Sequence, residues 1–188
     1  MQKAKDYTKK KTTLYLERDE NKRAIFLDLL DKTPIDKRVY LDESGVNQYL
    51  YRTYGRSLRG EQVFGEVSGK RFARESFIAG LSKGKLIAPM CFRGTCDTIL
   101  FNTWLKEVLI PELEPGQVLI LDNASFHRSK ETEKLVREAQ CHLLFLPPYS
   151  PDLNPIEKCW ANLKMKIREF LPSVTNLADA IDRAILSM

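Results

Sequence analysis

Short apolar runs alternate along this chain with longer segments in which apolar residues recur at helical spacing. The short runs are rich in β-branched, aliphatic and aromatic residues and stop at a turn residue or an acid, which is typical of strands. We expect strands over 38–43, 49–54, 71–81, 85–93, 118–121 and 142–146. The longer segments have an apolar face and begin or end at capping residues or proline. We expect helices over 19–31, 97–109, 129–140, 155–171 and 177–188.

The order of these elements predicts an α/β fold. The first strands follow one another, as antiparallel strands do, and the later strands alternate with helices, as parallel strands do. We therefore expect a mixed sheet with helices on its faces. The carboxyl ends of parallel strands converge on one crevice, and Asp42 and Asp122 both end such apolar runs.

The chain is long enough for one domain with its own core, since it has 188 residues. We divide it into an N-terminal basic arm and helix (1–37), a central domain (38–172) and a C-terminal helix (173–188). Net charge is +5, and the first 38 residues carry 11 Lys and Arg against 7 Asp and Glu. Such an arm is either a solvated tail or a contact to a nucleic-acid backbone.

The location of the protein follows from what the sequence lacks. No apolar run is long enough to cross a bilayer, and Met1 leads into a polar, lysine-rich segment instead of a signal peptide. Four cysteines, Cys91, Cys96, Cys141 and Cys159, match no zinc or redox spacing. We expect a cytoplasmic protein with reduced thiols and no membrane partner.

Three acids are candidates for chemistry: Asp42, Asp122 and Glu157. Each has a structural alternative. An Asp that ends a strand is often a turn residue, and segment 154–157 (NPIE) fits a capping box at the start of a helix. Glu43 competes with Asp42, but neighbouring strand residues point to opposite faces, so only one of the two can face the site.

Taken together, the acids predict a metal site. Carboxylates are hard oxygen ligands that suit Mg²⁺ or Mn²⁺. Two such ions, roughly 3.5–4 Å apart, can activate a water or a 3′-hydroxyl and stabilise the leaving oxygen of a displacement at phosphorus. Zinc fits less well, because the chain has only two histidines and no Cys/His cluster.

Four segments carry a resemblance to a known family. They are 41–45 (LDESG), 54–60 (YGRSLRG), 121–127 (LDNASFH) and 146–157 (LPPYSPDLNPIE). With them, the sequence from about residue 15 to 168 resembles the DDE transposases of the mariner superfamily, and within it the bacterial insertion-sequence type. The 34 residues between Asp122 and Glu157 agree with the acid spacing of that branch.

The resemblance implies an RNase H-like fold for the DDE catalytic domain, with a five-stranded mixed sheet of three antiparallel and two parallel strands. It implies that Asp42, Asp122 and Glu157 bind Mg²⁺ or Mn²⁺, with two ions expected. The implied reaction is cutting of DNA at transposon ends, followed by joining to target DNA. It also implies a homodimer on DNA, and a helix-turn-helix domain that this chain has no room for before Tyr15.

Several basic and aromatic residues are candidates for DNA contacts. Arg56 and Arg59 lie in a glycine-punctuated segment that allows close backbone approach to phosphates. Lys158 gives the helix of Glu157 a basic character, and His127 could place DNA or a metal-bound water. Each of these also has the alternative of a solvated or locally bonded side chain. Trp160 is expected in the core, with stacking on a DNA base as its alternative.

Two other functions fit the same acids. A nuclease or resolvase of this fold would cut DNA without joining it, so only the products distinguish it from a transposase. A degenerate DNA-binding remnant would bind no Mn²⁺. For any of the three, the expected location is the bacterial cytoplasm, in association with the nucleoid.

Overall fold

The computed structural model describes residues 15–47, 49, 62, 64–66, 69–70 and 74–188. Most of the expected strand 49–54, together with Arg56 and Arg59, lies outside the described residues. The strands are β1 (Arg38–Asn47), β2 (Arg74–Ser82), β3 (Lys85–Arg93), β4 (Val118–Leu121) and β5 (His142–Phe145). The α-helices are α1 (Glu20–Asp31), α2 (Thr98–Trp104), α3 (Lys130–Glu138), α4 (Ile156–Phe170) and α5 (Leu177–Leu186).

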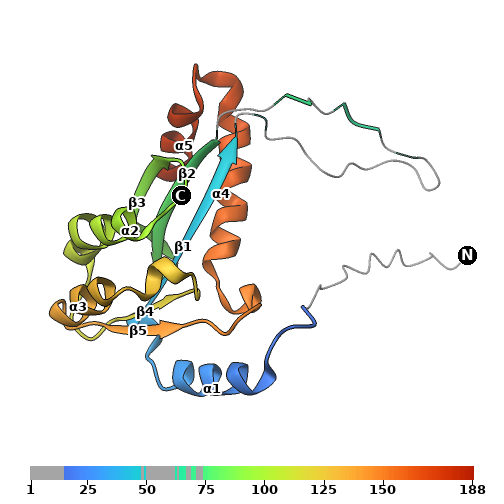
Figure 1. Cartoon of the computed structure of the whole chain (residues 1–188). Coiled ribbons are helices and arrows are strands. Elements are labelled where there is room, and N and C mark those ends of the chain that lie inside the picture. Colours follow the sequence, from blue (N-terminus) through green and yellow to red (C-terminus); the bar gives the residue numbers. More distant parts are fainter. Residues whose placement is uncertain (1–14, 48, 50–61, 63, 67–68, 71–73) are drawn as a thin grey trace, which may run out of the picture.

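The five strands form one mixed sheet in the order β3-β2-β1-β4-β5. Strands β1, β2 and β3 pair antiparallel, whereas β4 pairs parallel to β1 and β5 pairs parallel to β4. The predicted α/β class and the three-plus-two arrangement of strands are confirmed. Strands β1 and β4 run side by side in the same direction, and β1 continues beyond the carboxyl end of β4 (Figure 1).

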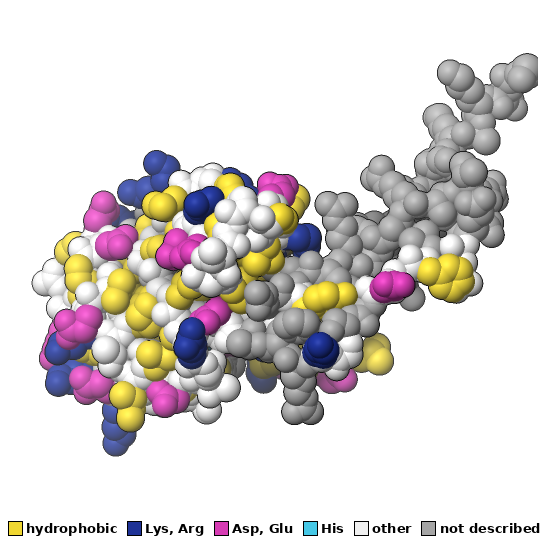
Figure 2. All heavy atoms as spheres, turned by 90° about the horizontal axis from the view of Figure 1, so that it is seen from above, with side chains coloured by type: hydrophobic (Ala, Val, Ile, Leu, Met, Phe, Trp, Pro, Cys, Tyr) yellow, Lys and Arg dark blue, Asp and Glu magenta, His cyan; other side chains and the backbone are white. Residues whose placement is uncertain are grey.

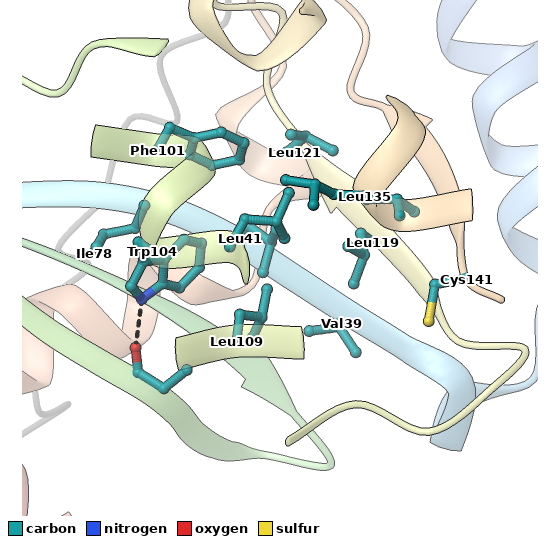
Figure 3. Packing of buried hydrophobic residues seen from close by; sticks show 13 residues of the cluster. Val39, Leu41, Ile78, Phe101, Trp104, Leu109, Leu119, Leu121, Leu135 and Cys141 are labelled. Atoms are coloured by element: carbon teal, nitrogen blue, oxygen red, sulfur yellow. Dashed lines mark hydrogen bonds between the residues drawn. The ribbon is translucent and has the colours of Figure 1, made fainter. Parts of the chain in front are cut away.

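Helices cover both faces of the sheet, and α4 and α5 lie on the opposite side from α2 and α3 (Figure 1). On the α2 and α3 side, Val39 and Leu41 of β1 pack with Phe101 and Trp104 (Figure 3). Trp104 is fully buried, and its Nε1 donates to the carbonyl of Ala88 at 2.8 Å. A buried donor needs such a partner, so this bond fixes the ring in the core.

The second face is closed by α4 and α5, whose buried residues share one cluster with Phe77 and Ala79 of β2. Helix α1 packs under the parallel edge, where Phe26 and Leu30 contact Ile120 and Leu146. Both faces of the sheet are thus apolar and covered, which is the arrangement expected where strands alternate with helices. Among the described residues, no helix combines the length and the apolar character needed to cross a membrane.

Helix starts agree with the capping residues in the sequence. The side chain of Asp19 accepts from backbone amides at the start of α1, Asp97 does so for α2 and Ser129 for α3. The connection between β2 and β3 is a tight turn, in which Lys83 and Gly84 have φ of 51° and 77°. Short-range signals therefore fixed these boundaries correctly.

Two boundaries differ from the sequence prediction. Strand β1 does not end after Glu43, because Ser44 and Gly45 continue to pair with β2 as far as Asn47. Gly45 serves close packing: a Cβ there would lie 2.5 Å from Nε of Arg74. The helix expected over 97–109 is α-helical only to Trp104 and continues as a π-helical segment, Leu105–Leu109.

Candidate active site

The three candidate acids line one cavity of about 440 Å³ at the carboxyl end of β4. Asp42 comes from β1, Asp122 directly follows β4, and Glu157 lies in the first turn of α4. Residues 146–151 and Tyr15 complete the walls. Elements far apart in the sequence therefore bring all three carboxylates to one hollow.

Strand alternation decides between Asp42 and Glu43. Val39 and Leu41 face α2 and α3, so Glu43 shares their side, and Asp42 points to the α4 side. The cavity contains Asp42, whereas Glu43 lines a separate cavity on the other face of the sheet. The expectation that only one of the two faces the site is met, and the residue is Asp42.

Asp42 is held by a tryptophan. Nε1 of Trp160 donates to Oδ2 of Asp42 at 2.9 Å, and the Trp160 side chain is only 2% exposed. Burial raises the pKa of Asp42 to about 7; the Trp160 bond opposes this rise, and the charges of Glu157 and Glu43 add to it. Trp160 is the core residue predicted, but its contact with Asp42 was not foreseen.

Asp122 is held through one oxygen. Its Oδ1 accepts from the backbone N–H of Ala124 at 2.9 Å and lies 2.8 Å from Nδ1 of His127. The hydrogen bond with His127 lowers the pKa of Asp122, burial opposes that shift, and the Ala124 amide adds to it. Because the side chain is 54% exposed, the carboxylate is anchored on one side and open to the cavity on the other.

His127 differs from the DNA-contacting residue that the sequence predicted. It is 1% exposed and lies between two carboxylates, with Nε2 3.0 Å from Oε1 of Glu43. Burial by itself would lower the pKa of His127, but the hydrogen bonds to Asp122 and Glu43 outweigh it and raise the pKa to about 9. A side chain enclosed in this way cannot reach a DNA backbone.

The capping box that was the structural alternative for Glu157 does not form at the start of α4. Pro155 occupies the N-cap position, where no side chain bonds the helix amides. Oδ1 of Asn154 is buried without a hydrogen-bond partner among the described residues, although Asn154 lines the same cavity as Glu157. Glu157 itself is exposed. The structural alternative for Glu157, that it serves to cap its own helix, therefore loses its support.

The donor set fits a hard divalent cation, since three carboxylates face one hollow. Within the described part of the chain, no three His, Cys, Asp or Glu side chains lie close enough together to hold a metal ion as they stand. Asp42 and Asp122 are each fixed by hydrogen bonds. We expect Glu157, in the exposed first turn of α4, to be the acid that shifts to complete such a site.

Metal affinity should depend on pH through Asp42. Its raised pKa of about 7 means that the proton, which a metal ion must displace, is bound below that pH. We expect the affinity for Mn²⁺ to fall by about tenfold per pH unit below pH 7 and to level off above it. Calorimetry between pH 6 and 8.5 measures this. Asp122, whose pKa is lowered, contributes no slope in that range, and a flat profile would contradict the prediction.

Two exposed features of the site bear on DNA. Lys158 follows Glu157 on α4 and is exposed, as a backbone contact requires. Tyr149, which the sequence analysis did not single out, lines the cavity, is 55% exposed and has φ of 54°, the left-handed region. Tyr15 lies beside it, with ring centroids 5.8 Å apart. Figure 2 shows basic, acidic and hydrophobic side chains interspersed on the described part of one face, so that part is not uniformly basic.

Comparison with known proteins identifies a family and several relatives in sequence. A family model described as a DDE superfamily endonuclease matches residues 37–178. The chain is 51% identical over 67 residues to the uncharacterized protein y4pE/y4sA of Sinorhizobium fredii, covering 35% of this chain and 47% of that one. It is 29% identical over 108 residues to the transposable element Tcb2 transposase of Caenorhabditis briggsae, covering 50% and 40%.

Solved structures show the same fold. The Mos1 strand transfer complex matches with a TM-score of 0.65 at 15% identity, over 98% of this chain and 66% of that one. The mariner Mos1 paired-end complex with Mg matches with a TM-score of 0.63 at 13% identity, over 98% and 67%. At such identities the likeness concerns the fold. The chain spans about half or less of the length of the curated relatives it matches.

Proposed function

Because this chain belongs to the DDE superfamily endonuclease family, we propose that it is the catalytic domain of a metal-dependent DNA transposase, with residues 38–172 as the catalytic core. The family-level resemblance seen in the sequence is confirmed, while the bacterial insertion-sequence branch stays a prediction. The observation that carries the proposal is the shared cavity of Asp42, Asp122 and Glu157. Asp122 directly follows β4, Asp42 lies at the same level within the adjacent parallel strand β1, and Glu157 lies on a helix.

The proposed reaction is cutting of phosphodiester bonds at transposon ends and attack of the freed 3′-hydroxyl on target DNA. Bound Mg²⁺ or Mn²⁺, two ions in our proposal, would supply activation of the attacking oxygen and stabilisation of the leaving one. Asp42 and Asp122 would hold them through the oxygens that Trp160 and His127 leave free, and Glu157 would complete the set. The relative with Mg in its complex supports the choice of metal.

The wider assembly is also part of the proposal. Relatives of this fold have been solved as paired-end and strand transfer complexes, which supports DNA as the partner. We further propose a homodimer as the acting form. The proposal includes a helix-turn-helix domain that reads the transposon ends, in keeping with the greater length of the curated relatives. We also propose that it acts on the nucleoid in a bacterial cytoplasm.

One experiment tests the function and separates it from its closest alternative. The chain is incubated with Mg²⁺ or Mn²⁺, a labelled duplex carrying the DNA that flanks its coding sequence, and a supercoiled target plasmid. Label joined to the plasmid supports a transposase. Cut duplex without joined label supports the nuclease or resolvase alternative. Absence of both products, together with absence of Mn²⁺ binding in the presence of duplex, would leave only the non-catalytic DNA-binding remnant.

Tyr149 should contribute to binding of the cut DNA end. An exposed aromatic ring at the cavity rim offers a stacking surface worth about 1–3 kcal/mol per base. We expect Tyr149→Ala to weaken binding of a duplex with a single-stranded end by about tenfold at fixed salt. Tyr149→Phe keeps the ring and should bind as the unaltered chain does. Fluorescence anisotropy measures both, and equal loss in the two variants would contradict stacking.

A further inference from the structure

We propose that Glu43 and His127 form a positioning pair that holds Asp122 by its Oδ1 and thereby presents Oδ2 to a divalent metal ion. The inference deepens the proposed function and rests on it, because Asp122 is a metal ligand only if that function holds. Neither residue would touch the metal or the DNA. Glu43 acts through His127, and His127 acts through Asp122.

The geometry joins the three side chains in a line. Nδ1 of His127 lies 2.8 Å from Oδ1 of Asp122, and Nε2 lies 3.0 Å from Oε1 of Glu43. Both distances are those of hydrogen bonds. Asp122 directly follows β4 and Glu43 lies in the middle of β1, so the imidazole ring links the carboxyl end of β4 to the neighbouring parallel strand.

The ring of His127 has little freedom to leave this position. It is 1% exposed, and the rings of Phe101 and Phe126 lie against it, with centroids 4.4 Å and 4.3 Å away. Phe101 belongs to the main core cluster and is fully buried. The fold itself, not a bound ligand, therefore sets the orientation of the imidazole.

The contacts of Asp122 are divided unequally between its two oxygens. Oδ1 accepts from the Ala124 amide at 2.9 Å as well as from His127. Two donors on one oxygen fix the carboxylate plane, and Oδ2 is then the oxygen offered to the cavity that Asp122 lines. Outer partners of this kind orient a metal ligand and usually matter for metal affinity.

Glu43 does not line the active-site cavity, so it can act on the metal site only indirectly, through His127. It follows Asp42 on β1 but points to the opposite face, where its side chain is 18% exposed. Its contact with His127 gives the buried ring a second anchor. The sequence therefore places two acids side by side, one to bind and one to position, on opposite faces of the same strand.

Two substitutions of His127 separate positioning from packing. Asparagine places an amide nitrogen near the former Nδ1 and keeps a donor for Asp122, whereas glutamine extends toward the Nε2 position and keeps only a partner for Glu43. By calorimetry at pH 8, we expect His127→Gln to raise the dissociation constant for Mn²⁺ by about 100-fold and His127→Asn, which loses only the contact with Glu43, by about tenfold. Equal losses in the two variants, or binding by His127→Gln as in the unaltered chain, would overturn the proposal.

A second pair of variants keeps the test decisive if His127 substitutions prevent folding. We expect Glu43→Gln to raise the same constant by about tenfold. Glu75→Gln is the matched control, because Glu75 is 14% exposed, lies on neighbouring strand β2 and pairs with Arg93 away from the cavity. Glu75→Gln should bind Mn²⁺ normally; a Glu43→Gln variant that does so too overturns the proposal.

Asp122→Asn, measured alongside, distinguishes failure of the pair from failure of the proposed function. Loss of Mn²⁺ binding in Asp122→Asn with normal binding in His127→Gln and Glu43→Gln would overturn the positioning pair alone. Absence of Mn²⁺ binding by the unaltered chain, with and without a DNA duplex, would overturn both. Thermal unfolding of each variant without metal confirms that the compared proteins are folded.

Discussion

Asp122→Asn should abolish most of the metal-dependent cleavage of DNA, with a rate reduced by about a thousandfold. The substitution preserves the size of the side chain but removes one negative charge from the metal site. Metal catalysis of phosphoryl transfer contributes several kcal/mol, and a loss of about 4 kcal/mol corresponds to about three powers of ten in rate. The fold should tolerate the change, because the carboxylate is 54% exposed.

The measurement is the initial rate of cleavage of a labelled duplex in Mn²⁺, with Asp152→Asn as the control. Asp152 lies in the short 3₁₀ segment Pro151–Leu153 next to the cavity, but it pairs with Arg23 of α1, at 2.7 Å between Nη2 and Oδ2, and does not line the cavity. Its substitution should leave the rate within about threefold of the unaltered chain, as for a surface pair. Equal activity of Asp122→Asn and the unaltered chain would remove Asp122 from the catalytic set.

Substitution of Trp160 should have the second large effect. Trp160→Ala should lower the stability of the fold, and Trp160→Phe should change the pKa of Asp42. Trp160→Ala removes a buried ring that packs 5.1 Å from the ring of Phe77, and we expect it to lower the free energy of unfolding by about 3–5 kcal/mol. Trp160→Phe keeps much of that packing and removes only the donor to Asp42. Since that donor opposes the rise in the pKa of Asp42, its loss should raise the pKa above about 7.

The consequence is a shift in the pH dependence of metal binding. In Trp160→Phe the proton on Asp42 should persist to higher pH, so Mn²⁺ binding should begin at higher pH than in the unaltered chain. Trp104→Phe is the matched control, because it also removes a buried indole donor, but one that bonds the carbonyl of Ala88 on the other face of the sheet. Identical pH profiles for Trp160→Phe and Trp104→Phe would show that the Trp160 bond does not control Asp42.

The sequence identified most of the elements and the three acids for local reasons. Periodicity, capping residues and turn residues act over a few positions, and they place α1, α2 and α3 within a residue or two at their starts. The end of β1 was missed because Ser44 and Gly45, which resemble a turn, are held in the strand by pairing with β2. Strand β2 begins at Arg74, too far along the sequence for a pattern of neighbouring residues to reveal the pairing.

The active site was likewise predicted only in part from the sequence. Strand alternation predicted that only one of Asp42 and Glu43 faces the cavity, and Glu157 could be placed on a helix. The partners of these acids could not be read from spacing, because Trp160 lies 118 positions from Asp42 and Glu43 lies 84 positions from His127. The short distance from Asp122 to His127 was a signal, but it suggested a DNA contact until burial of the ring was known.

The sequence by itself thus determined the class of fold, the family and the acids that carry the proposed chemistry. Hydrophobic periodicity and short motifs involve residues that are close in the sequence, so they can be recognised without the tertiary structure. Only the tertiary structure decided which oxygen of each aspartate is held, that Asn154 does not cap α4, and that His127 is an internal link. These depend on how β1, β4 and α4 pack against one another. That packing sets burial and hydrogen bonding between residues that the chain keeps far apart.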